Sequence, residues 1–204
     1  MLVYICSNWL EILGTMVGLI YLYLELKASI YLWLVSVVMP AIYMFVYFQH
    51  GLYADFGIQI YYLLAAIYGF AVWRFGKKRE EKVLPITYTP VRNYAYLTIS
   101  LLVLWALIAW ILLTFTNSTV PFWDSFTTAT SIVALWMLAH KYIEQWLVWV
   151  VVDAMYVGLY IYKDIYFTSG LYTLYTLIAV VGYLRWKKMM RNTPIAQSPM
   201  TDRG

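Results

Sequence analysis

An aspartate in the middle of an apolar stretch, Asp153, is the residue of this sequence most able to do chemistry. A charged side chain at the bilayer centre costs about 2.5–3.5 kcal/mol on insertion scales, so it is a functional candidate by default. Aromatic residues spaced alternately by three and four share its helix face. This face comprises Trp146, Trp149, Asp153, Tyr156 and Tyr160. It suits a flat cation, because aromatic faces and a carboxylate both attract positive charge. The alternative is a structural hydrogen bond from Asp153 to a neighbouring helix.

Four more polar side chains in apolar stretches are candidates for ligand binding: Gln59, Tyr62, Thr128 and Ser131. The amide of Gln59 and the hydroxyl of Tyr62 can hydrogen-bond a polar ligand, or equally a neighbouring helix. Thr128 and Ser131 share a helix face, and each can instead bond the backbone of its own helix.

Motifs for enzymatic chemistry are poor in this sequence. It holds one Cys and two His, and it has neither a metal-binding set of these residues nor a P-loop. We therefore expect no enzyme, no bound metal and no cofactor, and no ATP-driven transport by this chain alone.

The elements that position these residues are membrane-spanning helices. Of 204 residues, 64% are hydrophobic and 12% charged, against roughly 45–50% and about 25% in soluble domains. Helices are required because every backbone polar group must be satisfied within its own segment. We expect an all-α membrane protein of seven transmembrane helices, at residues 9–26, 30–47, 57–74, 94–115, 123–140, 146–162 and 170–187. Turns are expected at His50-Gly51, Asn117-Ser118 and Ser169-Gly170.

Orientation follows from the basic residues, which sit in short blocks between the apolar stretches. With the N-terminus outside and the C-terminus inside, every Lys and Arg except Lys163 falls on the inner side. This is the distribution of the positive-inside rule. The net charge of +4 therefore indicates topology and not a nucleic-acid partner.

The sequence contains an internal repeat, because residues 33–73 align without a gap on residues 146–186. Trp, Gly and Tyr recur in register, among them the pairs Trp33/Trp146, Gly69/Gly182 and Trp73/Trp186. We expect a three-helix repeat at 9–74, a linker helix at 94–115, a second three-helix repeat at 123–187 and a cytoplasmic tail at 188–204. The linker makes the repeats parallel, an arrangement found in secondary transporters that bind substrate between the two units. The alternative is a duplicated scaffold without transport.

The repeat-mate of Asp153 is Pro40. A proline inside a helix frees a backbone carbonyl and kinks the chain. The hypothesis is that Pro40 is a hinge; a static kink is the alternative.

The chain resembles the PnuC family of vitamin transporters over nearly its whole length, residues 9 to 186. The second half carries the resemblance in PFWDS from Pro121, SIVA from Ser131 and KYIEQWLVW from Lys141. The first half carries it in GLYA from Gly51, in Gln59 and in YGFAVW from Tyr68. The resemblance implies a three-plus-one-plus-three helix fold related to sugar-transporting SWEET proteins, and a homotrimer. It also implies facilitated diffusion with the vitamin trapped inside by phosphorylation, and it makes Gln59, Trp146, Trp149 and Asp153 pocket residues.

Within the family the chain looks like the thiamine branch, PnuT, because nicotinamide riboside members carry Asn where this chain has Asp153. The leading expectation is therefore a thiamine transporter of the bacterial inner membrane. The alternatives are a nicotinamide riboside or riboflavin transporter of the same family, and a non-transporting membrane receptor or scaffold.

Overall fold

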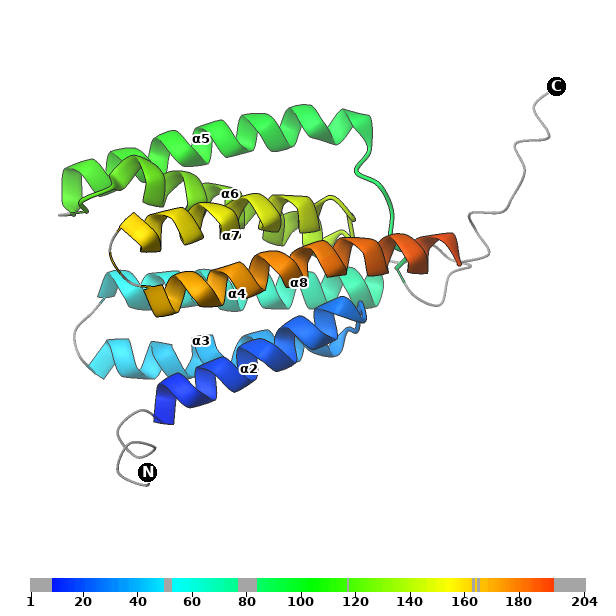
Figure 1. Cartoon of the computed structure of the whole chain (residues 1–204), viewed down its shortest axis with the longest axis horizontal. Helices are drawn as coiled ribbons and strands as arrows, with labels where there is room; N and C mark the ends of the chain where they lie inside the picture. Colours follow the sequence, from blue (N-terminus) through cyan, green and yellow to red (C-terminus); the bar gives the residue numbers. More distant parts are fainter. Residues whose placement is uncertain are drawn as a thin grey trace. The chain divides into compact units, whose positions relative to one another are not determined.

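The computed structural model describes residues 9–49, 53–76, 84–116, 118–162, 164 and 166–192. Seven α-helices make up this part of the chain, which contains no β-strand beyond one isolated bridge (Figure 1). The helices are α2 (Trp9–Leu26), α3 (Tyr31–Gln49), α4 (Tyr53–Phe75), α5 (Val91–Phe115), α6 (Pro121–Ala139), α7 (Gln145–Tyr162) and α8 (Tyr166–Arg191). The prediction of an all-helical fold with seven helices is confirmed.

The last helix is longer than predicted, and the turn expected at Ser169-Gly170 is wrong. Both residues lie inside α8, and the chain turns earlier, at Asp164, where φ is 57°. The Ser169 hydroxyl donates instead to the carbonyl of Val157, at 3.3 Å. The turn expected at His50-Gly51 lies outside the described residues, as does Asn117 of the third turn.

Three helices of the described part are long and apolar enough to cross a membrane by length and hydropathy: Phe56–Phe75, Val91–Phe115 and Gln145–Tyr162. Shorter apolar stretches occur at Met16–Leu26 and Tyr31–Phe45. Helix α6 is less hydropathic because it contains several Ser and Thr residues, yet hydroxyls such as those of Thr127 and Thr130 donate to backbone carbonyls of their own helix. Such bonding removes most of the cost of placing a hydroxyl in lipid.

The chain divides into two compact units, each described here by itself. Unit 1 is Met1–Leu84 and contains α2 to α4; unit 2 is Pro85–Gly204 and contains α5 to α8. The predicted linker helix, α5, packs within unit 2 against α6, where the Trp105 and Phe126 rings lie 5.3 Å apart, edge to face. Pro121 is the first residue of α6, where its missing N–H costs nothing.

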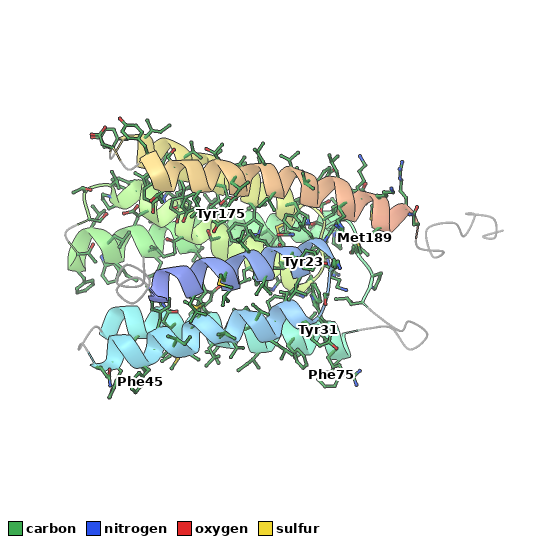
Figure 2. All side chains as sticks on the ribbon, turned by 60° about the horizontal axis from the view of Figure 1, so that its bottom comes forward. Tyr23, Tyr31, Phe45, Phe75, Tyr175 and Met189 are labelled. Atoms are coloured by element: carbon green, nitrogen blue, oxygen red, sulfur yellow. The ribbon has the colours of Figure 1, made fainter. Side chains whose placement is uncertain are left out.

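In unit 1, α3 and α4 form a close hairpin around Trp33. The indole of Trp33 lies directly over Gly69 of α4, where a Cβ would overlap it. It also meets Trp73 edge to face, with ring centroids 5.6 Å apart. Figure 2 shows Tyr31 and Phe75 at the same end of this hairpin and Phe45 toward the other end. Phe45 and Phe75 are among many exposed large apolar side chains, as expected of a surface that faces lipid.

Unit 2 repeats this contact in α7 and α8. Trp146 lies over Gly182, whose added Cβ would come within 2.6 Å of the indole ring. Trp146 meets Trp186 edge to face, with centroids 5.7 Å apart. The aligned residues of the repeat thus make the same contact in each unit, with the same geometry.

The loops that precede the two hairpins also match. Ala28 and Lys141, which are repeat-mates, are both left-handed, with φ of 48° and 54°. The amide N–H of each donates to a carbonyl three residues back, and the next N–H donates five residues back. This is a Schellman motif, which usually places glycine at the left-handed position. The repeat therefore extends to individual backbone hydrogen bonds, while the parallel arrangement of the two repeats stays a prediction.

Residues 85–90, at the start of unit 2, dock onto the α6–α7 loop of the same unit. The amide of Thr87 donates to the carbonyl of Lys141, and the amide of Ile143 donates to the carbonyl of Thr87. The Glu144 carboxylate then accepts bonds from the Thr89 amide at 3.0 Å, the Thr89 hydroxyl at 2.8 Å and the Tyr94 hydroxyl at 3.4 Å. The structure thus gives Glu144 the role of an anchor for this connecting segment.

Replacing Glu144 with alanine is expected to release that segment. A hydrogen bond to a charged group contributes about 1.5–3 kcal/mol, so the Thr89 amide should exchange its hydrogen roughly tenfold faster or more. Hydrogen exchange of the purified protein measures this. Asp164→Ala, which removes an exposed carboxylate bonded by the nearby Tyr166 hydroxyl, is the matched control. Unchanged protection of Thr89 in the Glu144 variant would contradict this role.

The Lys141 side chain is buried, and burial lowers its pKa from 10.5 to about 8. The unfolded chain therefore binds more protons than the folded one between about pH 8 and pH 10.5, and folding stability gains with rising pH across that window. We expect Lys141→Ala to remove this gain in folding stability. The variant has at position 141 the same residue as its repeat-mate, Ala28. Melting temperatures of wild type and variant at pH 7.5 and 9.5 test it, with Lys187→Ala on exposed α8 as the control. Equal pH slopes in wild type and Lys141→Ala would refute the assignment.

Candidate functional site

Asp153 lies midway along α7, with only 8% of its surface exposed. Its position follows from the apolar sequence of α7, which forms a continuous helix through the aspartate. Within the described residues, no side chain or backbone group forms a hydrogen bond or ion pair with this carboxylate. A buried carboxylate without such partners is costly in lipid, which is the mark of a group kept for binding.

Four tyrosine rings gather next to Asp153, and we call them the tyrosine cluster: Tyr156 and Tyr160 of α7, and Tyr172 and Tyr175 of α8. Tyr172 is central, with its ring centroid 4.8 Å from Tyr156, 5.4 Å from Tyr160 and 5.7 Å from Tyr175. The rings of Tyr156 and Tyr160 stack at 6.1 Å. All four are only partly buried, so the cluster offers ring surface to a ligand.

The α7–α8 hairpin brings these residues together. Spacings of four on α7 and three on α8 put each pair of rings on one helix face. Small residues of α8, Ala179 and Gly182, let the helix approach α7 closely, and Trp146 packs into the space that Gly182 leaves. The Asp153 carboxylate is close enough to interact electrostatically with Tyr172 and Tyr175. Figure 2 marks Tyr175 on α8.

This arrangement can bind a flat organic cation. Aromatic faces attract a cation within about 6 Å of the ring centroid, and more strongly when water is excluded. The carboxylate supplies the counter-charge, and the phenol hydroxyls can donate or accept hydrogen bonds from polar substituents. The described residues contain no group of three or more His, Cys, Asp or Glu side chains that could hold a metal ion.

The residues predicted on the α7 face have different environments. Tyr156 belongs to the tyrosine cluster, and Trp149 is partly buried. Trp146 is 1% exposed and serves the packing of α7 on α8, although its indole N–H has no hydrogen-bond partner in the part of the chain that the structure describes. A role of Trp146 and Trp149 in substrate binding stays a prediction.

The remaining candidates lie on other helices. Gln59 and Tyr62 are on α4 of unit 1, where Tyr62 is exposed and its ring is 5.5 Å from Tyr61. The hydroxyls of Thr128 and Ser131 on α6 donate to Asp124 and Thr127 carbonyls, at 2.7 and 2.8 Å. Both hydroxyls thus bond the backbone of their own helix, which was one of the two alternatives for them. Ligand contact by all four candidates, on α4 and on α6, stays a prediction.

Pro40 is buried inside α3, which continues on both sides of it. The hinge hypothesis therefore remains a prediction that the static structure does not test.

Tyr172 and Tyr175 were not predicted as site residues, whereas Tyr160 was predicted on the Asp153 face. The three-residue spacing of Tyr172 and Tyr175 was visible, but a tyrosine in a membrane helix is equally an interfacial anchor. Only the register of α8 against α7 shows that these rings meet those of Tyr156 and Tyr160.

Comparison with known proteins gives consistent matches over most of the chain. A family model described as nicotinamide mononucleotide transporter matches residues 8–188. The nicotinamide riboside transporter PnuC of Escherichia coli K12 is 26% identical over 203 residues, covering 88% of this chain and 85% of that protein. The riboflavin/roseoflavin transporter RibM of Streptomyces davaonensis is 23% identical, covering 87% and 84%. A crystal structure of the vitamin B3 transporter PnuC superposes with a TM-score of 0.68 at 24% identity, covering 93% of this chain and 85% of that one.

Proposed function

Because the chain belongs to the nicotinamide mononucleotide transporter family, the PnuC family of vitamin transporters, we propose that it carries a cationic aromatic vitamin across the bacterial inner membrane. The observation that supports this most is the buried Asp153 carboxylate beside the tyrosine cluster. A site of this kind favours a flat, positively charged ring over a neutral one.

Nicotinamide riboside is the first candidate substrate. Relatives from Escherichia coli and Neisseria mucosa that match about nine-tenths of this chain are nicotinamide riboside transporters. Its pyridinium ring is flat and cationic, and its ribose hydroxyls can bond the phenol oxygens of the tyrosine cluster. The comparisons thus favour this vitamin over thiamine, which was the leading expectation from the sequence.

Thiamine is the second candidate, and the observation that favours it is Asp153 itself. Its thiazolium ring is also a flat cation, and the resemblance implies Asn at this position in nicotinamide riboside members. Riboflavin, carried by the relative RibM, has a neutral ring system, so the carboxylate gives it no comparable advantage.

The mode of transport is also part of the proposal. Facilitated diffusion is proposed from the family resemblance. Trapping by phosphorylation would then draw substrate inward. The distribution of Lys and Arg supports an N-terminus outside and a cytoplasmic C-terminus, and a homotrimer is proposed from the family resemblance.

A competition assay separates the candidate vitamins. Labelled nicotinamide riboside is bound to the purified protein and displaced by unlabelled nicotinamide riboside, thiamine or riboflavin. The proposal expects the lowest half-displacing concentration for nicotinamide riboside. If thiamine has the lowest half-displacing concentration, the second candidate is selected, and displacement by none of the three would remove the proposed substrate class.

A further inference from the structure

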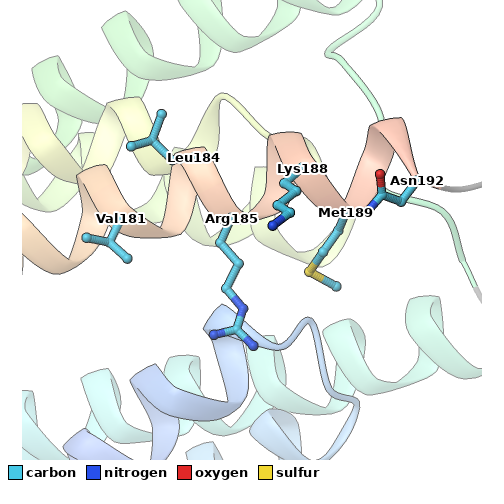
Figure 3. A pocket seen from close by; sticks show the side chains of 6 residues that line it. All are labelled: Val181, Leu184, Arg185, Lys188, Met189 and Asn192. Carbon is cyan, nitrogen blue, oxygen red and sulfur yellow. The ribbon is translucent and has the colours of Figure 1, made fainter.

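The C-terminal half of α8 has a face that its packing against α7 does not use. Helix α8 contacts α7 through Ala179, Gly182 and Trp186, which are buried. A shallow groove runs along another face of the same helix, as Figure 3 shows. The groove is lined by Val181, Leu184, Arg185, Lys188, Met189 and Asn192. Five of the six belong to α8, and Asn192 directly follows its last residue.

The groove changes from apolar to basic along its length. Val181 and Leu184 are 54% and 60% exposed, as expected for side chains that face lipid tails. One turn further, Arg185 and Lys188 are exposed cations, and Asn192 adds an amide at the end. None of the six lining residues is acidic.

The length of α8 puts this change at the level of the lipid headgroups. The helix has 26 residues, which at about 1.5 Å per residue is longer than the roughly 30 Å of a hydrocarbon core. Its basic residues all lie in the last turns, at Arg185, Lys187, Lys188 and Arg191. The apolar part of the groove therefore lies beside acyl chains, while Arg185 and Lys188 lie where phosphate groups are found.

We propose that this groove binds an anionic glycerophospholipid. Its phosphate is held between the Arg185 guanidinium and the Lys188 ammonium, with the Asn192 amide as a further donor, and one acyl chain lies along Val181 and Leu184. Charge complementarity selects this occupant: two cations and an amide donor meet an anionic headgroup, and a zwitterionic lipid brings its own cation into the same place. The site is separate from Asp153 and does not depend on the proposed function.

Native mass spectrometry of the full chain in detergent tests the proposal. The probes are phosphatidylglycerol and phosphatidylcholine with identical acyl chains, each titrated against wild type and Arg185→Gln/Lys188→Gln. Wild type should bind one phosphatidylglycerol in preference to phosphatidylcholine. Each basic residue near a membrane surface contributes about fivefold, so the double variant should bind phosphatidylglycerol roughly 30-fold more weakly.

Two controls make the test specific to the groove. Lys187→Gln/Arg191→Gln removes the same charge from other positions of the same helix end and should weaken binding clearly less than Arg185→Gln/Lys188→Gln, because neither of its side chains lines the groove. Arg185→Lys should retain most of the affinity, because the charge is kept. Inorganic phosphate is added as a competitor: displacement of the lipid at millimolar phosphate would show that the site recognises phosphate alone and overturn the lipid assignment. Equal loss in both double variants, or equal binding of the two lipids, would also overturn it.

Discussion

Asp153→Ala is expected to lower uptake of the cationic vitamin roughly 30-fold or more, because removing one member of a buried charge pair costs about 2–5 kcal/mol. Asp153 is nearly fully buried beside the tyrosine cluster, so a bound cation has little water to replace the lost charge. The loss should appear as a raised substrate concentration at half-maximal uptake. Expression and folding should stay near wild type, since the variant removes a buried charge that is costly at membrane depth. Uptake of labelled substrate into cells lacking other carriers measures the effect.

Asp164→Asn is the control for this variant. Asp164 is an exposed carboxylate of the same unit, bonded by the Tyr166 hydroxyl, and its loss should leave uptake unchanged. Asp153→Asn adds a discriminating result: it should spare nicotinamide riboside more than thiamine if the family pattern of Asn at this position holds. Normal uptake by Asp153→Ala would remove Asp153 from the site.

Adding a methyl group at either repeated glycine is expected to destabilise the protein. In Gly182→Ala the new Cβ would lie 2.6 Å from the Trp146 ring, and Gly69→Ala would meet the Trp33 ring in the same way. Overpacking of this kind costs about 1–3 kcal/mol. Both indoles are fully buried against a second Trp, so neither can move aside easily. Melting temperatures in detergent should fall by similar amounts in the two variants.

Gly158→Ala on α7 is the matched control, because a Cβ there meets nothing within 4 Å. Inside a helix this change should stabilise by about 0.5–1 kcal/mol. Combining Gly182→Ala with Trp146→Leu should recover part of the stability lost in Gly182→Ala, since the two residues share one contact. A fall in melting temperature for only one of Gly69→Ala and Gly182→Ala would argue against equivalent roles of the repeated contact.

The helices and the repeat could be predicted because both depend on local composition and on the spacing of residues along the chain. Apolar length sets a spanning helix, and the recurring Trp and Gly positions needed only an alignment of the chain with itself. What the alignment did not give is the reason for them. Trp33 and Gly69 are far apart in sequence, and their contact follows from the packing of two helices.

The turn predicted at Ser169-Gly170 was wrong because it depended on local composition alone. Ser169 and Gly170 look like a turn, yet the turn is made at Asp164 and the Ser169 hydroxyl finds a carbonyl on α7. In the segment 85–90, a backbone bridge and Glu144 fix the chain to the α6–α7 loop, a contact that local composition does not predict. In both cases a long-range hydrogen bond decides the structure, and such bonds leave no periodic signal in the sequence.

Asp153 could be predicted as a site residue because a charged side chain is costly inside a membrane. Of the four rings of the tyrosine cluster, only Tyr156 and Tyr160 could be predicted beside it. Tyr156 shares its helix, so spacing alone associates the two. Tyr172 and Tyr175 belong to α8, and their place beside Asp153 depends on the close approach that Gly182 and Ala179 permit.

Counterflow in proteoliposomes tests the central claim most directly. Vesicles containing the purified protein are loaded with unlabelled nicotinamide riboside, diluted into labelled nicotinamide riboside, and compared with vesicles loaded with thiamine and with vesicles containing Asp153→Ala. A transporter of this vitamin is expected to accumulate label transiently in wild-type vesicles, without ATP or an ion gradient, and to do so far more slowly in the variant. Binding of the vitamin without any exchange of label would contradict transport and identify a receptor or scaffold instead.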